Sequence, residues 1–308
     1  MESNRMKDTV VEKIQLFRSP DSKAQYDTAY AAMLEQWVVP FEELYVPTCC
    51  GDTHVITSGA PASPPLVLLH SAGSGAVQWF RNVGPLSNHF RTYAVDVIGE
   101  VNRSITTRKI RSRQEFVEWM KDLLNGLRIE KADIVGNSFG GFLAFNTALY
   151  LRQRVKKVVL ISPAATFVQM WPFYWHIAFP YKIGYLLHSN RMILSGFKWI
   201  WQDYPREGSL KRQYELGKVC GFPSNSLPPP VFSDEELRAI QTPMLLLIGD
   251  HEVIYKPERV IERATRLVKG LKAEIVPNAN HNAQVTAAEV VNKNIMDFLT
   301  EQENEKIP

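Results

Sequence analysis

The chain has 308 residues, of which 45% are hydrophobic and 22% charged, and its formal net charge at pH 7 is +3. This length and composition are typical of one large globular core, or of a core that carries an insertion. A net charge this small, with no basic stretch interleaved with aromatic residues, gives no support to nucleic-acid binding. We therefore expect that overall charge does not recruit the partner of this protein.

The start of the chain and its cysteines indicate the compartment. Residues 1–8 are polar and precede no apolar signal core, so we expect no cleaved secretion signal. Cys49, Cys50 and Cys220 make an odd count, and a disulfide between the adjacent pair would close a strained ring. We expect three free thiols that pack as small apolar groups, in a reducing, cytoplasmic compartment.

The first part of the chain predicts helices followed by a hairpin. Residues 10–37 place aromatic and apolar side chains at spacings of three and four, which is typical of helices packed on a core. Residues 43–48 and 53–57 predict two strands joined by a turn. These strands are expected to form the antiparallel edge of a sheet.

The next strand patterns alternate with helical patterns. Strands are predicted at 65–70, 91–97, 132–137 and 157–161. This alternation implies right-handed crossovers and a mostly parallel sheet with helices on both faces, an α/β fold. Ligands bind such sheets beyond the carboxyl ends of the strands.

The pattern then stops for a long segment. Residues 164–240 contain no strand pattern typical of the core, yet they hold almost half of the aromatic residues. Such an insertion is expected to be a helical, aromatic-rich cap over an apolar site. A membrane contact through 167–187 is the alternative. Because Pro172, Pro180 and Lys182 interrupt that stretch, we expect no stable membrane insertion.

After the insertion, strand patterns at 244–248 and 273–276 each lead into a helical pattern. The core is therefore predicted to be divided in the sequence. The predicted parts are a first core segment at 1–163 with a helical stretch at 1–40, the cap at 164–240, and a second core segment at 241–308.

The stretch that organises the rest is a Gly-x-Ser-x-Gly motif, Gly136-Asn137-Ser138-Phe139-Gly140. Three fixed positions match by chance too often to carry an argument alone, and a tight structural turn is the alternative interpretation. The strand before the motif and the helical pattern after it are, however, what a nucleophile elbow requires. We therefore expect the hydroxyl of Ser138 to be presented at the tip of a sharp turn.

Candidate acids and a base follow later strands. The strand at 244–248 is followed by Asp250 and Glu252, and the last strand is followed by His281. Serine, acid and histidine thus occur in the chain order of α/β-hydrolases, each after a separate strand. The order alone leaves either carboxylate as the acid.

With these motifs the chain resembles α/β-hydrolases of the capped carboxylesterase group. The run Gly249-Asp250-His251-Glu252-Val253-Ile254-Tyr255 resembles bacterial carboxylesterases that hydrolyse naproxen esters. The resemblance covers nearly the whole chain and implies the α/β-hydrolase fold and esterase activity. In this superfamily the acid commonly stands three residues after the glycine that ends the strand, which favours Glu252. Asp250 is then expected to order the loop.

The resemblance implies a catalytic triad of Ser138, His281 and Glu252. His281 would take the serine proton as the carbonyl is attacked and return it to the leaving alcohol. Glu252 would fix the imidazole tautomer and stabilise its cationic form. Water would then hydrolyse the acyl-enzyme.

An oxyanion hole is expected from two backbone amides, one of which is that of Phe139. The other is that of Ala72 or Ser71, because the usual His-Gly step of the superfamily is His70-Ser71 in this chain. The triad and the oxyanion hole need no metal and no organic cofactor, and we expect neither.

The function expected is that of a serine carboxylesterase acting on small to medium apolar esters. A serine at position 138 argues against the dehalogenase and epoxide hydrolase branches, which resemble this fold but need a carboxylate nucleophile. Three alternatives stay open: a carbon-carbon bond hydrolase of ring-cleavage products, a ligand receptor on a hydrolase scaffold with little turnover, and a membrane-associated lipase. The oligomeric state is left open.

Overall fold

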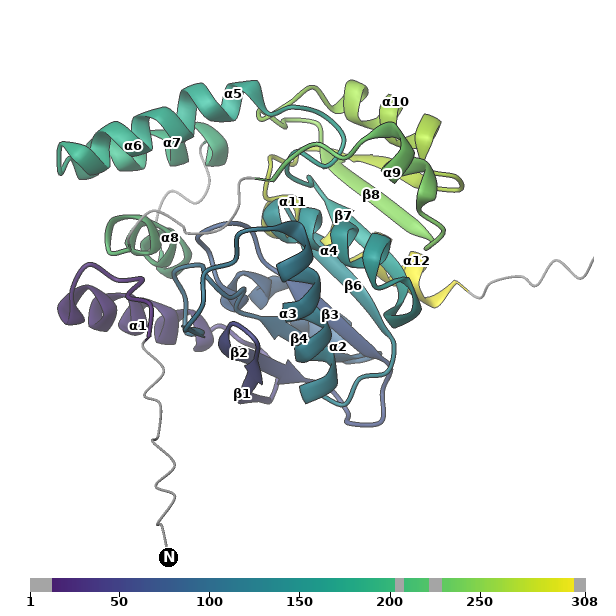
Figure 1. The fold of residues 1–308 in the computed structure, drawn as a ribbon, viewed down its shortest axis with the longest axis horizontal. Coiled ribbons are helices and arrows are strands. Elements are labelled where there is room, and N and C mark those ends of the chain that lie inside the picture. Colours follow the sequence, from purple (N-terminus) through teal and green to yellow (C-terminus); the bar gives the residue numbers. More distant parts are fainter. Residues whose placement is uncertain (1–12, 203–207, 222–228, 302–308) are drawn as a thin grey trace, which may run out of the picture.

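A computed structural model of the chain describes residues 13–202, 208–221 and 229–301. A central sheet runs through the molecule with the strand order β1-β2-β4-β3-β6-β7-β8-β9, and β5 pairs with β2 (Figure 1). The strands are β1 (Phe41–Thr48), β2 (Gly51–Ser58), β3 (Pro65–Leu69), β4 (Arg91–Val95), β5 (Ile105–Thr106), β6 (Ala132–Asn137), β7 (Val155–Ile161), β8 (Met244–Gly249) and β9 (Lys272–Val276).

Along this strand order only β2 runs opposite to the other strands. β1 pairs antiparallel with β2, and β2 pairs antiparallel with β4. From β4 through β3, β6, β7 and β8 to β9 every pairing is parallel. This confirms the predicted mostly parallel sheet with an antiparallel edge. The carboxyl ends of its parallel strands therefore share one edge.

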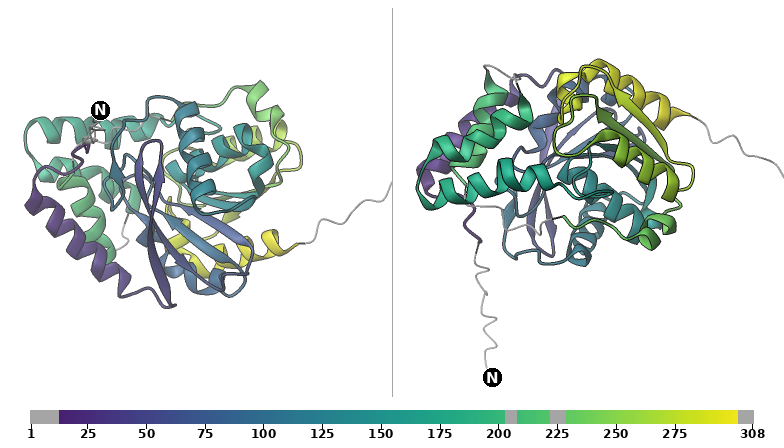
Figure 2. Two further views of the ribbon diagram at one scale, coloured as in Figure 1. Left: turned by 60° about the horizontal axis from the view of Figure 1, so that its bottom comes forward. Right: turned by 90° about the horizontal axis from the view of Figure 1, so that it is seen from above.

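Helices cover both faces of the sheet, as Figure 2 shows. α3 and α4 pack together on one face, where α10 also lies, while α2 and α12 pack on the other. The strands between these layers are buried on both sides, which is why β3 and β8 are continuous apolar runs. The covering helices are α2 (Val83–Ser87), α3 (Arg113–Gly126), α4 (Phe139–Tyr150), α10 (Pro257–Leu267), α11 (Ala283–Thr286) and α12 (Ala288–Thr300).

The described residues between β7 and β8 form helices and add no strand to the sheet. α5, α6 and α7 lie beyond the carboxyl ends of the parallel strands, and α8 packs against α1, Pro20–Leu34 (Figure 1). The segment contains α5 (Trp171–Phe173), a π-helical turn (Tyr174–Ala178), α6 (Phe179–Leu186), α7 (Asn190–Trp201), α8 (Ser209–Val219) and α9 (Asp234–Ala239).

One local prediction was wrong at the start of the chain. Helices were expected over residues 10–37, and the described residues before Pro20 form none. α1 begins at Pro20, where the Ser19 side chain caps it by accepting from the amide of Ser22. Residues 13–19 are not helical, and residues 10–12 lie outside the described part. The amides of Ile14 and Arg18 instead donate to carbonyls far away in the chain. These tertiary hydrogen bonds outweigh the local helical spacing.

No helix among the described residues is both long enough and apolar enough to cross a membrane.

Candidate active site

Ser138 lies at a sharp turn between β6 and α4. Its φ of 53° is in the left-handed region, which non-glycine residues rarely adopt and which is typical of strained functional turns. The flanking glycines are required by space: a Cβ on Gly136 would lie 2.2 Å from the carbonyl oxygen of Gly140. A Cβ on Gly140 would lie 2.1 Å from the carbonyl oxygen of Leu69. The turn therefore requires glycine two positions before and two positions after the serine.

His281 follows β9 and is held by Glu252, which follows β8. Its Nδ1 lies 2.7 Å from Oε2 of Glu252, and both side chains are buried. The other ring nitrogen, Nε2, is buried and has no hydrogen-bond partner among the described residues. Ser138 and His281 line the same cavity. The imidazole is thus fixed at one nitrogen and available at the other.

The carboxylate of Glu252 accepts hydrogen bonds from the backbone amides of the two residues that follow it. The amides of Val253 and Ile254 each donate to Oε1 at 2.9 Å. Burial alone would raise the pKa of Glu252, but His281 and the Ile254 amide outweigh it, so the pKa lies below its ordinary value. Glu252 is therefore ionised at neutral pH and favours a proton on Nδ1 of His281.

Asp250, the other candidate acid, binds backbone and not the imidazole. Its two oxygens accept from the amides of Asn278 and Ala279, each at 3.0 Å. These bonds tie the turn after β8 to the loop that carries His281. The loop-ordering interpretation of Asp250 agrees with this geometry.

The two possible oxyanion amides after β3 differ in availability. The amide of Ser71 donates to Oε1 of Gln78 at 2.9 Å, so it is already used. Ala72 lines the cavity together with Phe139, which is the first residue of α4 and has no acceptor for its amide within that helix. The sequence did not point to Gln78, because a single glutamine carries no recognisable motif.

The cavity that contains Ser138 and His281 has a volume of about 600 Å³. The helices between β7 and β8 supply much of its wall, which is mainly aromatic and aliphatic. Among the residues of this wall are Met170, Trp171, Phe173, Trp175, Phe179 and Ile200. Glu100, Lys182 and Lys218 are its charged members. A site of this kind suits a mainly apolar ligand with few polar groups.

His70 lies close to this site, but both of its ring nitrogens form hydrogen bonds with the backbone. Its Nε2 accepts from the amide of Val97 at 2.9 Å, and its Nδ1 donates to the carbonyl oxygen of Ser71 at 2.7 Å. Burial lowers the pKa of His70. Its neutral ring is therefore a structural support for the turn after β3.

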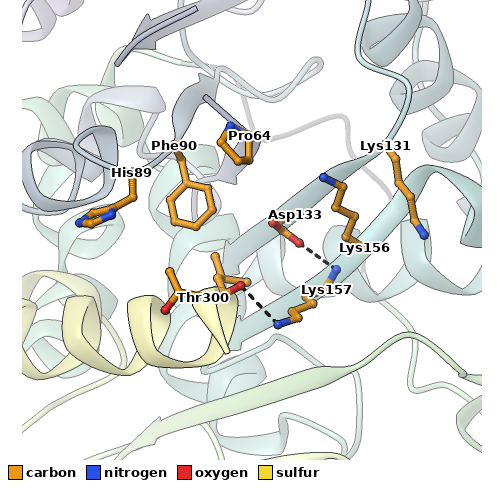
Figure 3. Close-up of a pocket in the computed structure, with 9 residues that line it drawn as sticks. Pro64, His89, Phe90, Lys131, Asp133, Lys156, Lys157 and Thr300 are labelled. Carbon is orange, nitrogen blue, oxygen red and sulfur yellow. Dashed lines mark hydrogen bonds between the residues drawn. The ribbon is translucent and has the colours of Figure 1, made fainter. Parts of the chain in front are cut away.

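A second cavity, of about 540 Å³, lies at the opposite end of the strands (Figure 3). It opens beside the first residues of β3, β6 and β7 and is lined in part by Asp133 and Lys157. Asp133 accepts from the amide of Lys157 at 3.0 Å, and Nζ of Lys157 donates to the carbonyl oxygen of Phe298 at 2.9 Å. These contacts hold the end of α12 to the sheet.

Comparison with known proteins decides the family. A model of the alpha/beta hydrolase fold matches residues 64–198. Carboxylesterase YbfK of Bacillus subtilis is 38% identical over 290 residues, which cover 92% of this chain and 96% of that protein. The chain belongs to the α/β-hydrolase family. A 2-hydroxy-6-oxo-2,4-heptadienoate hydrolase of Pseudomonas putida is 26% identical over 79% of this chain and 91% of its own length.

Two crystal structures from Bacillus subtilis resemble this α/β-hydrolase, each with a TM-score of 0.83. Carboxylesterase CesB (YbfK) is 37% identical and covers 91% of this chain and 99% of its own. The naproxen esterase (carboxylesterase NP) is 34% identical and covers 92% of this chain and 99% of its own. The predicted fold, the resemblance to bacterial carboxylesterases and the class of carboxylic ester hydrolases are therefore confirmed.

Proposed function

We propose that this carboxylesterase acts through an acyl-enzyme on Ser138, with His281 as general base and acid and Glu252 as the acid of the triad. The observation that carries the proposal is the state of the imidazole. Nδ1 of His281 is bound to Glu252, its Nε2 has no partner among the described residues, and His281 lines the same cavity as Ser138. A nucleophile, a base and an orienting carboxylate in this relation are the parts of a serine hydrolase.

The mechanism follows from these roles. Nε2 of His281 accepts the proton of Ser138 as the serine oxygen attacks the ester carbonyl. Glu252 stabilises the imidazolium that results, and the same proton then passes to the departing alcohol. A water molecule, activated in the same way, attacks the acyl-enzyme and releases the carboxylic acid.

We assign the oxyanion hole to the backbone amides of Ala72 and Phe139. Ala72 is preferred to Ser71 because Gln78 already accepts from the Ser71 amide. Each such donor stabilises the tetrahedral intermediate by about 3 kcal/mol.

The cavity wall supports small to medium apolar esters as substrates, with residues 164–240 as a cap between core segments at 1–163 and 241–308. Its aromatic side chains offer surface for apolar acyl or alcohol groups. We also propose a cytoplasmic location, which the free thiols of Cys49, Cys50 and Cys220 support.

Covalent labelling tests the nucleophile directly. The purified protein is treated with a p-nitrophenyl alkylphosphonate, and the intact mass and the peptide map are recorded. One phosphonyl group on the peptide that contains Ser138 is expected, with none in Ser138→Ala. Ser195→Ala, which changes an exposed serine on α7, is the matched control and should label like the wild type. Labelling of Ser138→Ala at the wild-type rate would overturn the proposal.

A further inference from the structure

One face of α8 contacts the loop of residues 71–74, which contains the proposed oxyanion amide. Oη of Tyr214 lies 2.6 Å from Oγ of Ser71. Nε2 of Gln213 donates to the carbonyl oxygen of Ser74. This helix lies between β7 and β8 in sequence, so residues of the proposed cap reach the core loop beside Ser138.

Lys218, near the end of α8, and Glu100, which follows β4, bind the two ends of a single peptide in this loop. Nζ of Lys218 donates to the carbonyl oxygen of Ala72 at 3.2 Å. The amide of Gly73 donates to Oε2 of Glu100 at 2.9 Å. That carbonyl and that amide belong to the peptide that joins Ala72 to Gly73. An ammonium and a carboxylate thus hold this peptide from opposite ends.

The fit around Gly73 is close. Its φ is +73°, which favours glycine, and a Cβ at this position would lie 2.0 Å from Nζ of Lys218. On the helix side, a Cβ on Gly217 would lie 2.8 Å from the carbonyl oxygen of Gly73. Helix and loop therefore approach each other at two glycines, and the Lys218 side chain fills the space that a larger residue at 73 would need.

Burying the charged side chains of Lys218 and Glu100 beside this loop costs free energy. Glu100 is almost completely buried, and both residues belong to the wall of a mainly apolar cavity. Burial lowers the pKa of Lys218, while the nearby carboxylate of Glu100 acts in the opposite direction. Opposite charges in such surroundings add little net stability compared with apolar residues of similar size. Stability alone therefore does not explain an ammonium and a carboxylate at these positions.

The preceding peptide, which carries the amide of Ala72, is held separately. Its carbonyl oxygen belongs to Ser71 and accepts from Nδ1 of His70 at 2.7 Å and from Oγ of Ser74 at 2.9 Å. Fixing both peptides that flank the Cα of Ala72 fixes its φ and ψ, and with them the direction of its N–H. The amide of Ser74 also donates to the Ser71 carbonyl oxygen, at 3.2 Å, and closes the turn. The hydrogen bonds of Lys218 and Glu100 are those that hold the Ala72–Gly73 peptide itself.

We infer that Lys218 and Glu100 are positioning residues that hold the Ala72–Gly73 peptide, so that the Ala72 amide stays aimed at the oxyanion. The inference rests on the proposed function, since it assumes that Ala72 supplies an oxyanion donor. It also gives α8 a direct part in transition-state stabilisation, in addition to any part in enclosing the substrate.

The test replaces each charged group by methionine, an apolar side chain of similar length. Lys218→Met, Glu100→Met and the double variant are compared with Lys198→Met, which changes an exposed lysine on α7 outside the cavity wall. Far-ultraviolet circular dichroism and thermal melting establish which variants fold. Turnover of p-nitrophenyl butyrate gives kcat and KM. A trifluoromethyl ketone, whose adduct with serine carries an oxyanion, gives affinity for a transition-state mimic.

For each of the two single variants we expect kcat to fall about tenfold to a hundredfold, less than the full loss of an oxyanion donor. KM should change by less than about threefold, and trifluoromethyl ketone affinity should fall in parallel with kcat/KM. The double variant should be little worse than the poorer single variant, because both groups hold one peptide. Glu100→Gln, which keeps an acceptor for the Gly73 amide, should recover part of the loss. Lys198→Met should behave like the wild type.

Folded Lys218→Met or Glu100→Met with unchanged kcat and unchanged ketone affinity would overturn the inference. A fall in kcat without loss of ketone affinity would do the same, because it would indicate a role outside the oxyanion hole. If Lys218→Met does not fold, Glu100→Met tests the other end of the same peptide. Ser138→Ala distinguishes failure of this inference from failure of the proposed function. Equal turnover by that variant and the wild type would contradict the proposed function itself.

Discussion

Glu252 and Asp250 stand two residues apart in the turn after β8, yet Glu252 binds Nδ1 of His281 at 2.7 Å whereas Asp250 accepts from the amides of Asn278 and Ala279. One carboxylate orients the imidazole, and the other fixes the loop that carries it. Two side chains of the same charge in one turn therefore have separable effects on activity and on stability.

The first prediction separates those effects. Glu252→Gln should lower kcat by about four decades, because the imidazole loses the carboxylate that selects its tautomer and stabilises its cation. Asp250→Asn should keep most of kcat and lose about 1 kcal/mol of unfolding free energy, since it still accepts one amide. Steady-state kinetics and urea denaturation measure the two. A larger loss of kcat in Asp250→Asn than in Glu252→Gln would reverse the assignment.

The second prediction concerns pH. Because the pKa of Glu252 is lower in the folded protein than its ordinary value, the unfolded chain binds its proton first as pH falls. The stability that ionised Glu252 contributes to the folded protein is thus fully present above the ordinary glutamate pKa. It is lost as pH falls through the pKa of Glu252 in the folded protein. The unfolding free energy of the wild type should exceed that of Glu252→Gln at pH 7, and the gap should narrow with acidification below about pH 4.3. A gap that stays constant from pH 7 to 3 would contradict this.

The third prediction addresses Gln78. Its Oε1 accepts from the amide and the hydroxyl of Ser71, both at 2.9 Å, and its Nε2 donates to Asn137 at 2.8 Å. Gln78→Met leaves the buried amide of Ser71 without its acceptor, so we expect a loss of about 1–3 kcal/mol in unfolding free energy. The Ser71 hydroxyl keeps its contact with Tyr214, and Asn137 still accepts from Gln284. A fall in kcat should accompany it, because the turn that precedes Ala72 loosens. Gln36→Met, at an exposed position in the turn after α1, is the control and should change neither quantity.

The fourth prediction distinguishes a steric clash from backbone strain. Gly140→Ala puts a Cβ 2.1 Å from the carbonyl oxygen of Leu69, so the elbow must shift, at a cost of about 3 kcal/mol or more. Gly270→Ala meets no atom within 4 Å and carries only the strain of its φ of +73°, which costs about 1–2 kcal/mol. Thermal and urea denaturation of the two variants should show this order. Equal losses would mean that the close approach of α4 to β3 is not what requires glycine.

Much of the fold and of the candidate site could be predicted because the relevant signals are local. A buried parallel strand is a continuous apolar run, and residues just beyond its carboxyl end meet at one edge of the sheet. These two signals predict Ser138, Glu252 and His281 in neighbouring loops. The preference for Glu252 over Asp250 came from the resemblance. The contact between Glu252 and Nδ1 of His281 supports the same preference independently.

What could not be predicted depends on contacts between distant parts of the chain. Nothing in the local sequence relates Lys218 to Glu100, since one lies on a helix between β7 and β8 and the other in a turn after β4. The non-helical course of residues 13–19 has the same origin, because the amides of Ile14 and Arg18 donate to the carbonyl oxygens of Thr106 and Cys220. Hydrogen bonds between residues so far apart in the chain leave no periodic pattern in the sequence.

The most direct test of Ser138 as an esterase nucleophile is the steady-state hydrolysis of dissolved p-nitrophenyl butyrate by the purified protein. Ser138→Ala, prepared identically, is the blank. We expect many turnovers by the wild type, at substrate concentrations below the solubility limit, and a rate near background for the variant. Equal rates for the two proteins, or no rate above background for either, would contradict that role. A carbon-carbon bond hydrolase or a ligand receptor on the same scaffold would then become the better interpretation.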